Sequence, residues 1–291
     1  MNSKPVKLLV KLLLTAVAVY LVVSKIDTQT TWSVIKEADF GWLGLALLFY
    51  VASKVFCAFR LNGYFRDMGV YLPEWQNLKL YAIGMFYNLF LPGGIGGDGY
   101  KVYLLKRRFQ APVKQLIQAV VLDRGNGLAV LVFLLFALLV VVEVDWAFPV
   151  SQWILGALGM FMVTVGLYLT MILFFKDFMG SIFSTTAYSA LNQVLQLFSA
   201  FFILRSLGIH DQEATYLLVF LVSSIISVLP LTIGGVGARE LVFVYAHGYV
   251  GIDKNAAVAF SVVFFVIAAF TSLSGIFFKF DSEMPVNERL H

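Results

Sequence analysis

The chain has 291 residues, 60% of them hydrophobic and only 13% charged, and its mean hydropathy is +0.86. Because soluble domains carry about one quarter charged residues, this composition excludes a soluble globular protein and indicates an integral membrane protein. The formal net charge is only +4, and the single cysteine, Cys57, excludes an intramolecular disulfide. No polar stretch is long enough to form a soluble domain.

Hydropathy predicts an all-α polytopic fold with six membrane-spanning helices. Their approximate ranges are 12–23, 41–59, 113–142, 153–175, 182–204 and 256–278. The first range also resembles a secretory signal peptide, but its apolar sequence continues beyond the candidate cleavage site at 16–18 and favours an uncleaved helix. The second is expected to end at Arg60. The third exceeds the roughly 20 residues that a bilayer requires, so it is expected to tilt or to project into the cytosol.

Two glycine-rich breaks interrupt shorter apolar stretches, one in each half of the chain. The first reads LPGGIGGDG over 91–99 and the second LPLTIGGVG over 229–237, so both have the pattern L-P-x-x-I-G-G-x-G. Such a break at membrane depth is tolerated only where the backbone is buried in protein or lines a cavity. A pair of breaks in corresponding halves indicates the binding site of a transporter.

The two halves are predicted to form an inverted repeat. Residues 66–70 (RDMGV) resemble residues 205–209 (RSLGI), and Glu74 corresponds to Glu213. Chance similarity between glycine-rich segments is the alternative interpretation. Duplication is favoured because these features and the breaks occur in the same order in both halves.

The distribution of positive charge orients the chain. The positive-inside rule places both termini in the cytosol, with Arg60, Lys79 and the cluster 106–108 on the cytosolic side. The first break would then lie at the tip of a re-entrant hairpin that enters from the cytosol. The second hairpin would enter from outside, and the two tips would meet.

These observations predict one transmembrane domain. It covers 1–278, with repeat 1 at about 41–142 and repeat 2 at about 182–278, and a polar cytosolic tail follows at 279–291.

The candidate substrate-binding residues lie at the breaks and in the third span. An ionisable residue at membrane depth costs roughly 2.5–3.5 kcal/mol, so it is retained when it is paired or functional. Asn88 is expected to hydrogen-bond the broken backbone. The full candidate set is Asn88, Pro92, Gly94, Gly96, Gly97, Asp98, Lys101, Asp123, Arg124, Pro230, Gly234, Gly235, Gly237, Arg239 and Glu240.

Each charged candidate also has a structural interpretation. Asp98 is placed to cap the helix after the first break, and Lys101 is placed to snorkel to the cytosol. Ion pairs of Asp123 with Lys101, or of Arg124 with Asp98 or Glu240, are a further alternative. The remaining intramembrane cation, Lys54, lies six residues before Arg60 and is interpreted as a snorkelling residue.

The candidate set indicates an anionic ligand. Three cations and two helix N-termini favour a phosphate-bearing group, while the three carboxylates keep the empty site near neutral. The surrounding apolar spans suit acyl or isoprenoid chains, so the expected partner is an anionic membrane lipid. The sequence has no metal-binding, nucleotide-binding or hydrolase motif, so no metal, cofactor, nucleic acid or catalytic residue is expected.

These motifs resemble the flippase-like transmembrane region of the lysylphosphatidylglycerol synthases, also called multiple peptide resistance factors. The resemblance covers nearly the whole chain and rests on Asn88, the run 91–98, Asp123-Arg124, Leu229-Pro230 and the run 234–240. Members of the family often have arginine in place of Lys101 and glutamate in place of Asp123. Both differences keep the charge, but lysine lacks bidentate phosphate geometry.

The resemblance implies movement of a phospholipid or polyprenyl-phosphate lipid between the leaflets of a bacterial cytoplasmic membrane. Some members carry a fused cytosolic aminoacyltransferase domain, which we expect this chain to lack, so lysyl transfer is not inferred. Two alternatives are a membrane enzyme of lipid-linked glycan assembly or phospholipid modification, with Asp98 or Asp123 as base, and an accessory subunit of such an enzyme. A lipid-modifying enzyme and a second copy of the chain stay open as protein partners.

Overall fold

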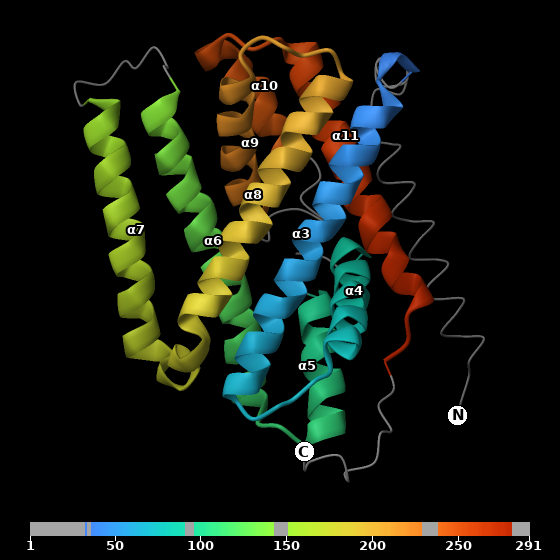
Figure 1. The fold of residues 1–291 in the computed structure, drawn as a ribbon, viewed down its shortest axis with the longest axis vertical. Coiled ribbons are helices and arrows are strands. Elements are labelled where there is room, and N and C mark those ends of the chain that lie inside the picture. Colours follow the sequence, from blue (N-terminus) through green and yellow to red (C-terminus); the bar gives the residue numbers. More distant parts are fainter. Residues whose placement is uncertain (1–32, 34–35, 91–95, 143–150, 229–237, 281–291) are drawn as a thin grey trace.

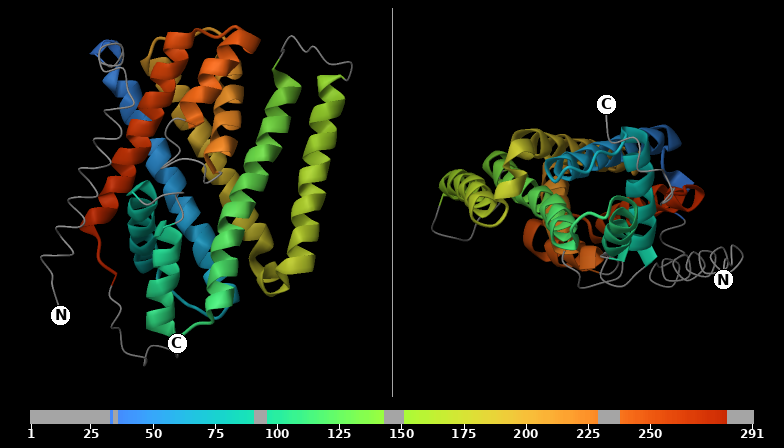
Figure 2. Two further views of the ribbon diagram at one scale, coloured as in Figure 1. Left: turned by 180° about the vertical axis from the view of Figure 1, so that it is seen from behind. Right: turned by 90° about the horizontal axis from the view of Figure 1, so that it is seen from below.

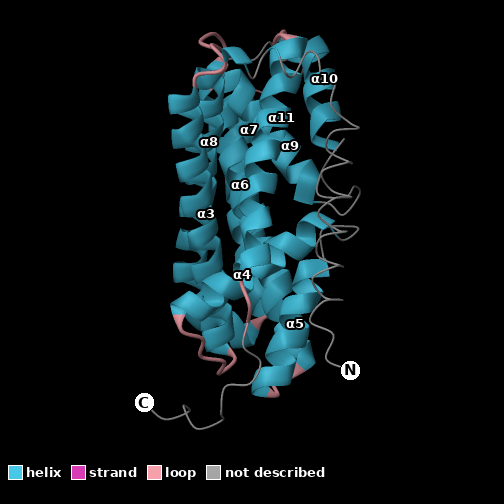
Figure 3. Cartoon of the chain, turned by 90° about the vertical axis from the view of Figure 1, so that its right-hand side faces the viewer, coloured by secondary structure: helices cyan, strands magenta, loops and turns pink. Residues whose placement is uncertain are grey.

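The computed structural model describes residues 33, 36–90, 96–142, 151–228 and 238–280, and these residues form helices joined by short loops (Figures 1 and 3). The α-helices are α3 (Phe40–Asp67), α4 (Glu74–Phe90), α5 (Gly96–Phe109), α6 (Val113–Val141), α7 (Gln152–Phe174), α8 (Ile182–Ser206), α9 (Glu213–Val228), α10 (Ala238–Val250) and α11 (Lys254–Leu273). Two short 3-10 helices, η2 (Lys176–Ser181) and η4 (Ser274–Phe277), precede α8 and follow α11.

Five helices of the described part are long and apolar enough to cross a membrane. They cover Phe40–Asp67, Val113–Val141, Gln152–Phe174, Lys176–Ser206 and Asn255–Phe277. The all-helical, multi-pass fold is therefore confirmed, and five of the six predicted spans are present. The first predicted span, 12–23, lies outside the described residues.

The predicted end of the second span at Arg60 is wrong, because α3 continues to Asp67. The helix ends two residues before Gly69, which has a φ of 80°. The Gly69 N–H donates to the carbonyl of Arg66 at 3.0 Å and the Val70 N–H donates to that of Phe65 at 2.9 Å. These bonds satisfy the last free carbonyls of the helix, and the left-handed φ is accessible to glycine at no steric cost.

The corresponding end of α8 has the same local structure. Gly208 also has a positive φ, 71°. An ion pair joins Arg66 to Glu74 after α3, and another joins Arg205 to Glu213 after α8, with 3.0 Å between nitrogen and oxygen in the second pair. The residues aligned in the sequence thus make equivalent contacts, while the boundaries of the two repeats stay a prediction.

The short helices form two pairs in opposite halves of the bundle. The pair α4 and α5 lies in the lower half of Figure 1 and the pair α9 and α10 in the upper half. The two breaks that join the members of each pair lie mostly outside the described residues. At the contact between α4 and α5, the backbones touch: a Cβ at Gly97 would lie 1.9 Å from the carbonyl oxygen of Gly84.

Two apolar clusters hold these pairs in place. One surrounds α9, α10 and α11 and includes Phe220, Phe243 and Phe260. The other joins α4 and α5 to the ends of α3 and α6 and includes Phe65 and Leu105. The long helices α3 and α6 contribute to both clusters, so the stretch of each helix between the clusters is available for polar residues. Figure 2 shows the outer position of α7, which packs on α6.

Candidate functional site

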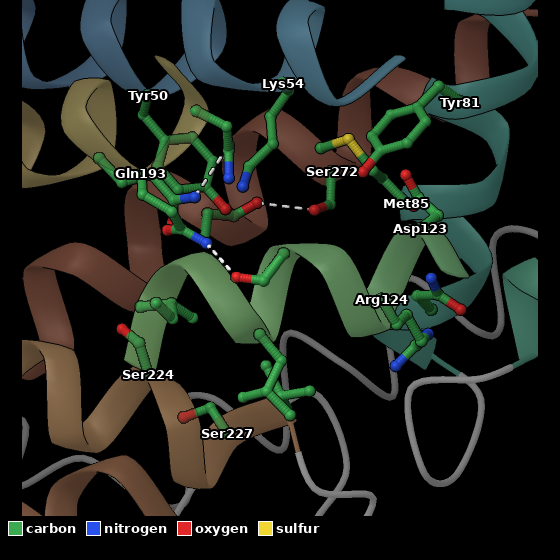
Figure 4. A pocket seen from close by; sticks show the side chains of 18 of the residues that line it. Tyr50, Lys54, Tyr81, Met85, Asp123, Arg124, Gln193, Ser224, Ser227 and Ser272 are labelled. Carbon is green, nitrogen blue, oxygen red and sulfur yellow. Dashed lines mark hydrogen bonds between the residues drawn. The ribbon is translucent and has the colours of Figure 1, made fainter. Parts of the chain in front are cut away.

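A polar cavity of about 350 Å³ lies at mid-height between the two apolar clusters (Figure 4). Its wall is built from α3 to α6 and from α8 to α11. Lys54 on this wall lies 14 residues after the start of α3 and 13 before its end, and Gly127 lies 14 residues from either end of α6. At 1.5 Å per residue, both positions are about 20 Å from the ends of their helices.

Asp98 holds two cations at one side of the cavity. Its Oδ1 lies 2.8 Å from Lys101 Nζ and its Oδ2 lies 2.5 Å from Arg124 Nε. Both Asp98 and Lys101 are buried, and the Lys101 ammonium also lies 4.8 Å from the centre of the Tyr81 ring. Lys101 therefore does not snorkel. Of the predicted ion pairs, the one between Arg124 and Asp98 is present.

Lys101 is fixed in this position by the contact between α4 and α5. A Cβ at Gly84 would lie 2.5 Å from Lys101 Cε, so the lysine side chain crosses α4 where glycine leaves room. The predicted hydrogen bond of Asn88 to the broken backbone is also present, since its Oδ1 accepts from the Gly97 N–H at 2.8 Å. Asn88 lines the cavity, whereas Gly97 and the neighbouring Gly96 form the first turn of α5.

A second buried ion pair joins three helices. Arg60 Nε donates to Asp123 Oδ1 at 2.7 Å, and Arg60 Nη1 donates to Ser189 Oγ at 3.0 Å. A Cβ at Gly127 would lie 2.8 Å from Arg60 Nη1, so the guanidinium fills the space beside this glycine. The alternative pairing of Asp123 with Lys101 is wrong. Counting Arg60 among the cytosolic charges was also wrong, because its side chain is buried in the bundle.

The wall of the cavity also contains Arg239 of α10. Its guanidinium lies 4.6 Å from the centre of the Phe264 ring and 5.6 Å from that of Phe220, and it lines the cavity. The described part of the site thus contains Asn88, Asp98, Lys101, Asp123, Arg124 and Arg239. The predicted site residues Pro92, Gly94, Pro230, Gly234, Gly235 and Gly237, and the Glu240 side chain, lie outside the described part.

Sequence reasoning assigned no site role to several residues that line the cavity. Lys54 was interpreted as a snorkelling residue because the helix was predicted to end at Arg60, whereas α3 continues to Asp67 and places Lys54 at its centre. Gln193 of α8 donates to the Gly127 carbonyl at 3.1 Å and lines the cavity as well. The other uncharged polar lining residues are Tyr50, Tyr81, Asn192, Gln196, Ser224, Ser227 and Ser272.

The charges of the cavity are not balanced among the described residues. Five cations and two carboxylates line it, which leaves three formal positive charges: Lys54, Arg60, Lys101, Arg124 and Arg239 against Asp98 and Asp123. Such a cavity at the centre of long apolar helices favours an anionic group.

A family model described as "Lysylphosphatidylglycerol synthase TM region" matches residues 8–185 and 178–275, which together cover most of the chain. Among curated proteins, none matches the chain.

Proposed function

The chain belongs to the lysylphosphatidylglycerol synthase TM region family, and from this premise we propose that it moves an anionic, phosphate-bearing lipid between the two leaflets of a membrane. The membrane-spanning helices and the family together identify a multi-pass membrane protein related to lipid modification or transport. Transport of the lipid itself is the proposal.

The cationic cavity at mid-height supports this proposal most directly. A lipid head group that crosses a bilayer needs a polar site near the midplane, because the hydrocarbon interior offers it no partner. The cavity supplies cations from several helices, such as Arg124 on α6 and Arg239 on α10. The acyl or isoprenoid chains would extend between apolar helices toward the surrounding lipid.

The short helix pairs supply a mechanism for access from both sides. With 17 residues in α4 and 14 in α5, each is shorter than the roughly 20 residues of a full span. We propose that α4 and α5 form a re-entrant hairpin from the cytosol, because the last turn of α5 is basic and basic ends favour the cytosolic side. The pair α9 and α10 would enter from the other side, and both termini would be cytosolic. Rocking of the two halves would open the cavity to each leaflet in turn.

The ion pairs favour transport over the alternative of a membrane enzyme. Asp98 contacts two cations and Asp123 contacts Arg60, so the oxygens of both carboxylates are already engaged by cations of the protein. A general base must instead take up a proton during the reaction. This arrangement fits binding of an anion better than acid–base catalysis.

Vesicles that contain only the purified protein test the proposal. A phospholipid with a fluorescent head group is distributed over both leaflets, and a membrane-impermeant quencher is added. In protein-free vesicles only the outer-leaflet label is quenched; with the protein, the inner-leaflet label of an anionic lipid is expected to become accessible. A zwitterionic phosphatidylcholine is the matched control. Absence of movement for every anionic lipid tested would refute transport, and dependence on a donor substrate would favour the enzyme.

A further inference from the structure

Resting on the proposed function, we infer that the head group of the lipid carries hydroxyl groups in addition to its phosphate. Gln193 is the specificity-determining residue, because its side-chain oxygen accepts a hydrogen bond from one of these hydroxyls. The ligand class is therefore an anionic lipid with a polyol head group, rather than one with a plain alkyl or an ammonium head group.

The amide of Gln193 presents an acceptor to the cavity. Gln193 is buried on α8 and lines the cavity. Its Nε2 donates to the Gly127 carbonyl at 3.1 Å, and because a carbonyl only accepts, this bond fixes which end of the amide faces Gly127. Among the described residues, no donor is bonded to the remaining oxygen, Oε1. The oxygen of Gln193 is thus left for a donor that enters the cavity.

Two hydroxyls of the cavity wall have already used their protons. Ser227 Oγ donates to the Ser223 carbonyl at 2.7 Å, and Ser272 Oγ donates to the Ala268 carbonyl at 2.8 Å. Each hydroxyl has one proton, so the oxygens of Ser227 and Ser272 can only accept a further bond. Ser224 is buried, and its hydroxyl has no hydrogen-bond partner in the described part of the chain. The neutral part of the wall therefore offers several unused acceptors.

These acceptors need donors, which an ionised phosphodiester does not supply. A head group that displaces water from a polar cavity loses affinity unless it replaces the hydrogen bonds of that water. The unesterified oxygens of the phosphodiester accept hydrogen bonds and donate none, so they cannot bond to Gln193 Oε1. A hydroxyl does donate, and a head group with hydroxyls therefore fits this part of the wall.

Helices α3 and α8 are antiparallel, and two contacts fix their register. Near the start of α3, the Ala46 carbonyl accepts from Ser199 Oγ at 2.8 Å, and Ser199 lies near the end of α8. Farther along α3, Arg60 Nη1 donates to Ser189 Oγ at 3.0 Å, and Ser189 lies near the start of α8. The stretch of α3 between Ala46 and Arg60 thus packs on the stretch of α8 between Ser199 and Ser189.

Lys54 and Gln193 lie near the middle of these two stretches, so they line the cavity at the same level (Figure 4). No carboxylate of the described residues forms an ion pair with Lys54. An ammonium bonded to Gln193 Oε1 would therefore lie near a second ammonium, and the two like charges would repel each other. A hydroxyl supplies the same donor without charge. The position of Lys54 thus favours hydroxyls over amines as the donors.

Three lipids with the same dioleoyl chains test this inference. They are phosphatidylglycerol, its analogue phosphatidylpropanol, whose n-propyl head group lacks both hydroxyls, and phosphatidylethanolamine. Native mass spectrometry measures their binding to the purified protein in detergent at pH 7.5. The wild type is expected to bind phosphatidylglycerol about tenfold more tightly than phosphatidylpropanol, a difference of about 1.4 kcal/mol, which is comparable to one or two net hydrogen bonds. Phosphatidylethanolamine is expected to bind no more tightly than phosphatidylpropanol.

Variants of Gln193 test the residue itself. Gln193→Met keeps the length of the side chain but has no amide oxygen, so it is expected to bind the two anionic lipids equally. Gln193→Glu keeps the acceptor and loses the donor to Gly127, so it is expected to retain the preference, although its added charge weakens binding of both lipids. A purely structural role through the Gly127 bond predicts instead that both variants lose the preference. Gln118→Met is the matched control, since Gln118 donates to the Phe174 carbonyl at 3.5 Å and lies outside the cavity; it is expected to keep the tenfold preference.

The outcomes separate this inference from the proposed function. If the wild type binds neither anionic lipid, the proposed function itself fails. If it binds the two equally, the hydroxyl requirement is overturned while transport of an anionic lipid stands. If Gln193→Met keeps the preference, or if Gln193→Glu loses it, the role of Gln193 is overturned. Binding of phosphatidylethanolamine as tight as that of phosphatidylglycerol would overturn the choice of hydroxyls over amines. Gln193→Leu replaces the methionine variant if that protein is not recovered.

Discussion

Gly97→Ala is expected to disrupt the contact between α4 and α5, because the backbones of the two helices touch at this residue. The new Cβ would lie 1.9 Å from the carbonyl oxygen of Gly84 and 2.9 Å from Asn88 Oδ1. Carbon and carbonyl oxygen approach to about 3.3 Å even in close contacts, so the helices would have to separate by about 1.4 Å. Overpacking of this kind costs about 1–3 kcal/mol. The shift would also weaken the hydrogen bond from the Gly97 N–H to Asn88.

Gly99→Ala, two residues further along α5, is the matched control. Among the described residues, no atom outside the adjoining backbone of α5 lies within 4 Å of the position of its new Cβ. Because alanine is favoured over glycine in a helix by about 0.5–1 kcal/mol, this variant should be as stable as the wild type or slightly more so. Thermal unfolding in detergent and the vesicle transport assay would be run on both variants. Equal melting temperatures and equal transport for the two would refute the role assigned to the contact between α4 and α5.

Three further variants and one control variant test the ion pairs and the packing of α7. Asp123→Asn leaves buried Arg60 without its anion, so we expect a loss of about 3–5 kcal/mol in the free energy of unfolding; an unchanged denaturation midpoint would contradict this. Arg124→Gln should fold, because the carboxylate that it contacts keeps its lysine partner, but should transport anionic lipid poorly; wild-type transport rates would exclude a role in binding. Gly159→Ala would place a Cβ 2.4 Å from a phenylalanine ring of α6, whereas Gly166→Ala meets no atom within 4 Å. Only the first should lower the melting temperature, by a shift that corresponds to about 1–3 kcal/mol, and equal shifts would contradict this packing.

Hydropathy predicted the spans well, because the apolar length of a helix that crosses a bilayer is a property of a single segment. The hydrogen bond of Asn88 could also be predicted, since the break leaves backbone groups that need partners. The pair of Asp98 and Arg124 was one of the predicted ion pairs, since a charge at membrane depth needs a partner. The first predicted span and most of the two breaks lie outside the described residues.

The errors concern residues whose partners are distant in the sequence. Arg60 follows an apolar run and resembles the basic end of a helix, yet it bonds to Asp123, 63 residues away. The true end of α3 is set by the glycine at 69, which is a weaker signal than a charge. Lys54 was assigned to snorkelling by its distance from Arg60, an inference that failed together with the assumed end of the helix.

In the proposed topology, the single membrane crossing made by the outer helix α7 determines the relative direction of the two halves. No described residue of α7 lines the cavity, and its buried residues are confined to Gly156, Gly159 and Met171. In the proposed topology each half crosses the membrane twice, so a direct junction would start both halves in the same direction. A single added crossing makes the number of passes from the start of the first half to the start of the second odd and turns the second half upside down. Helix α7 thus has no part in the wall of the cavity, yet it sets the topology. Without its crossing, both glycine-rich tips would enter the membrane from the same compartment.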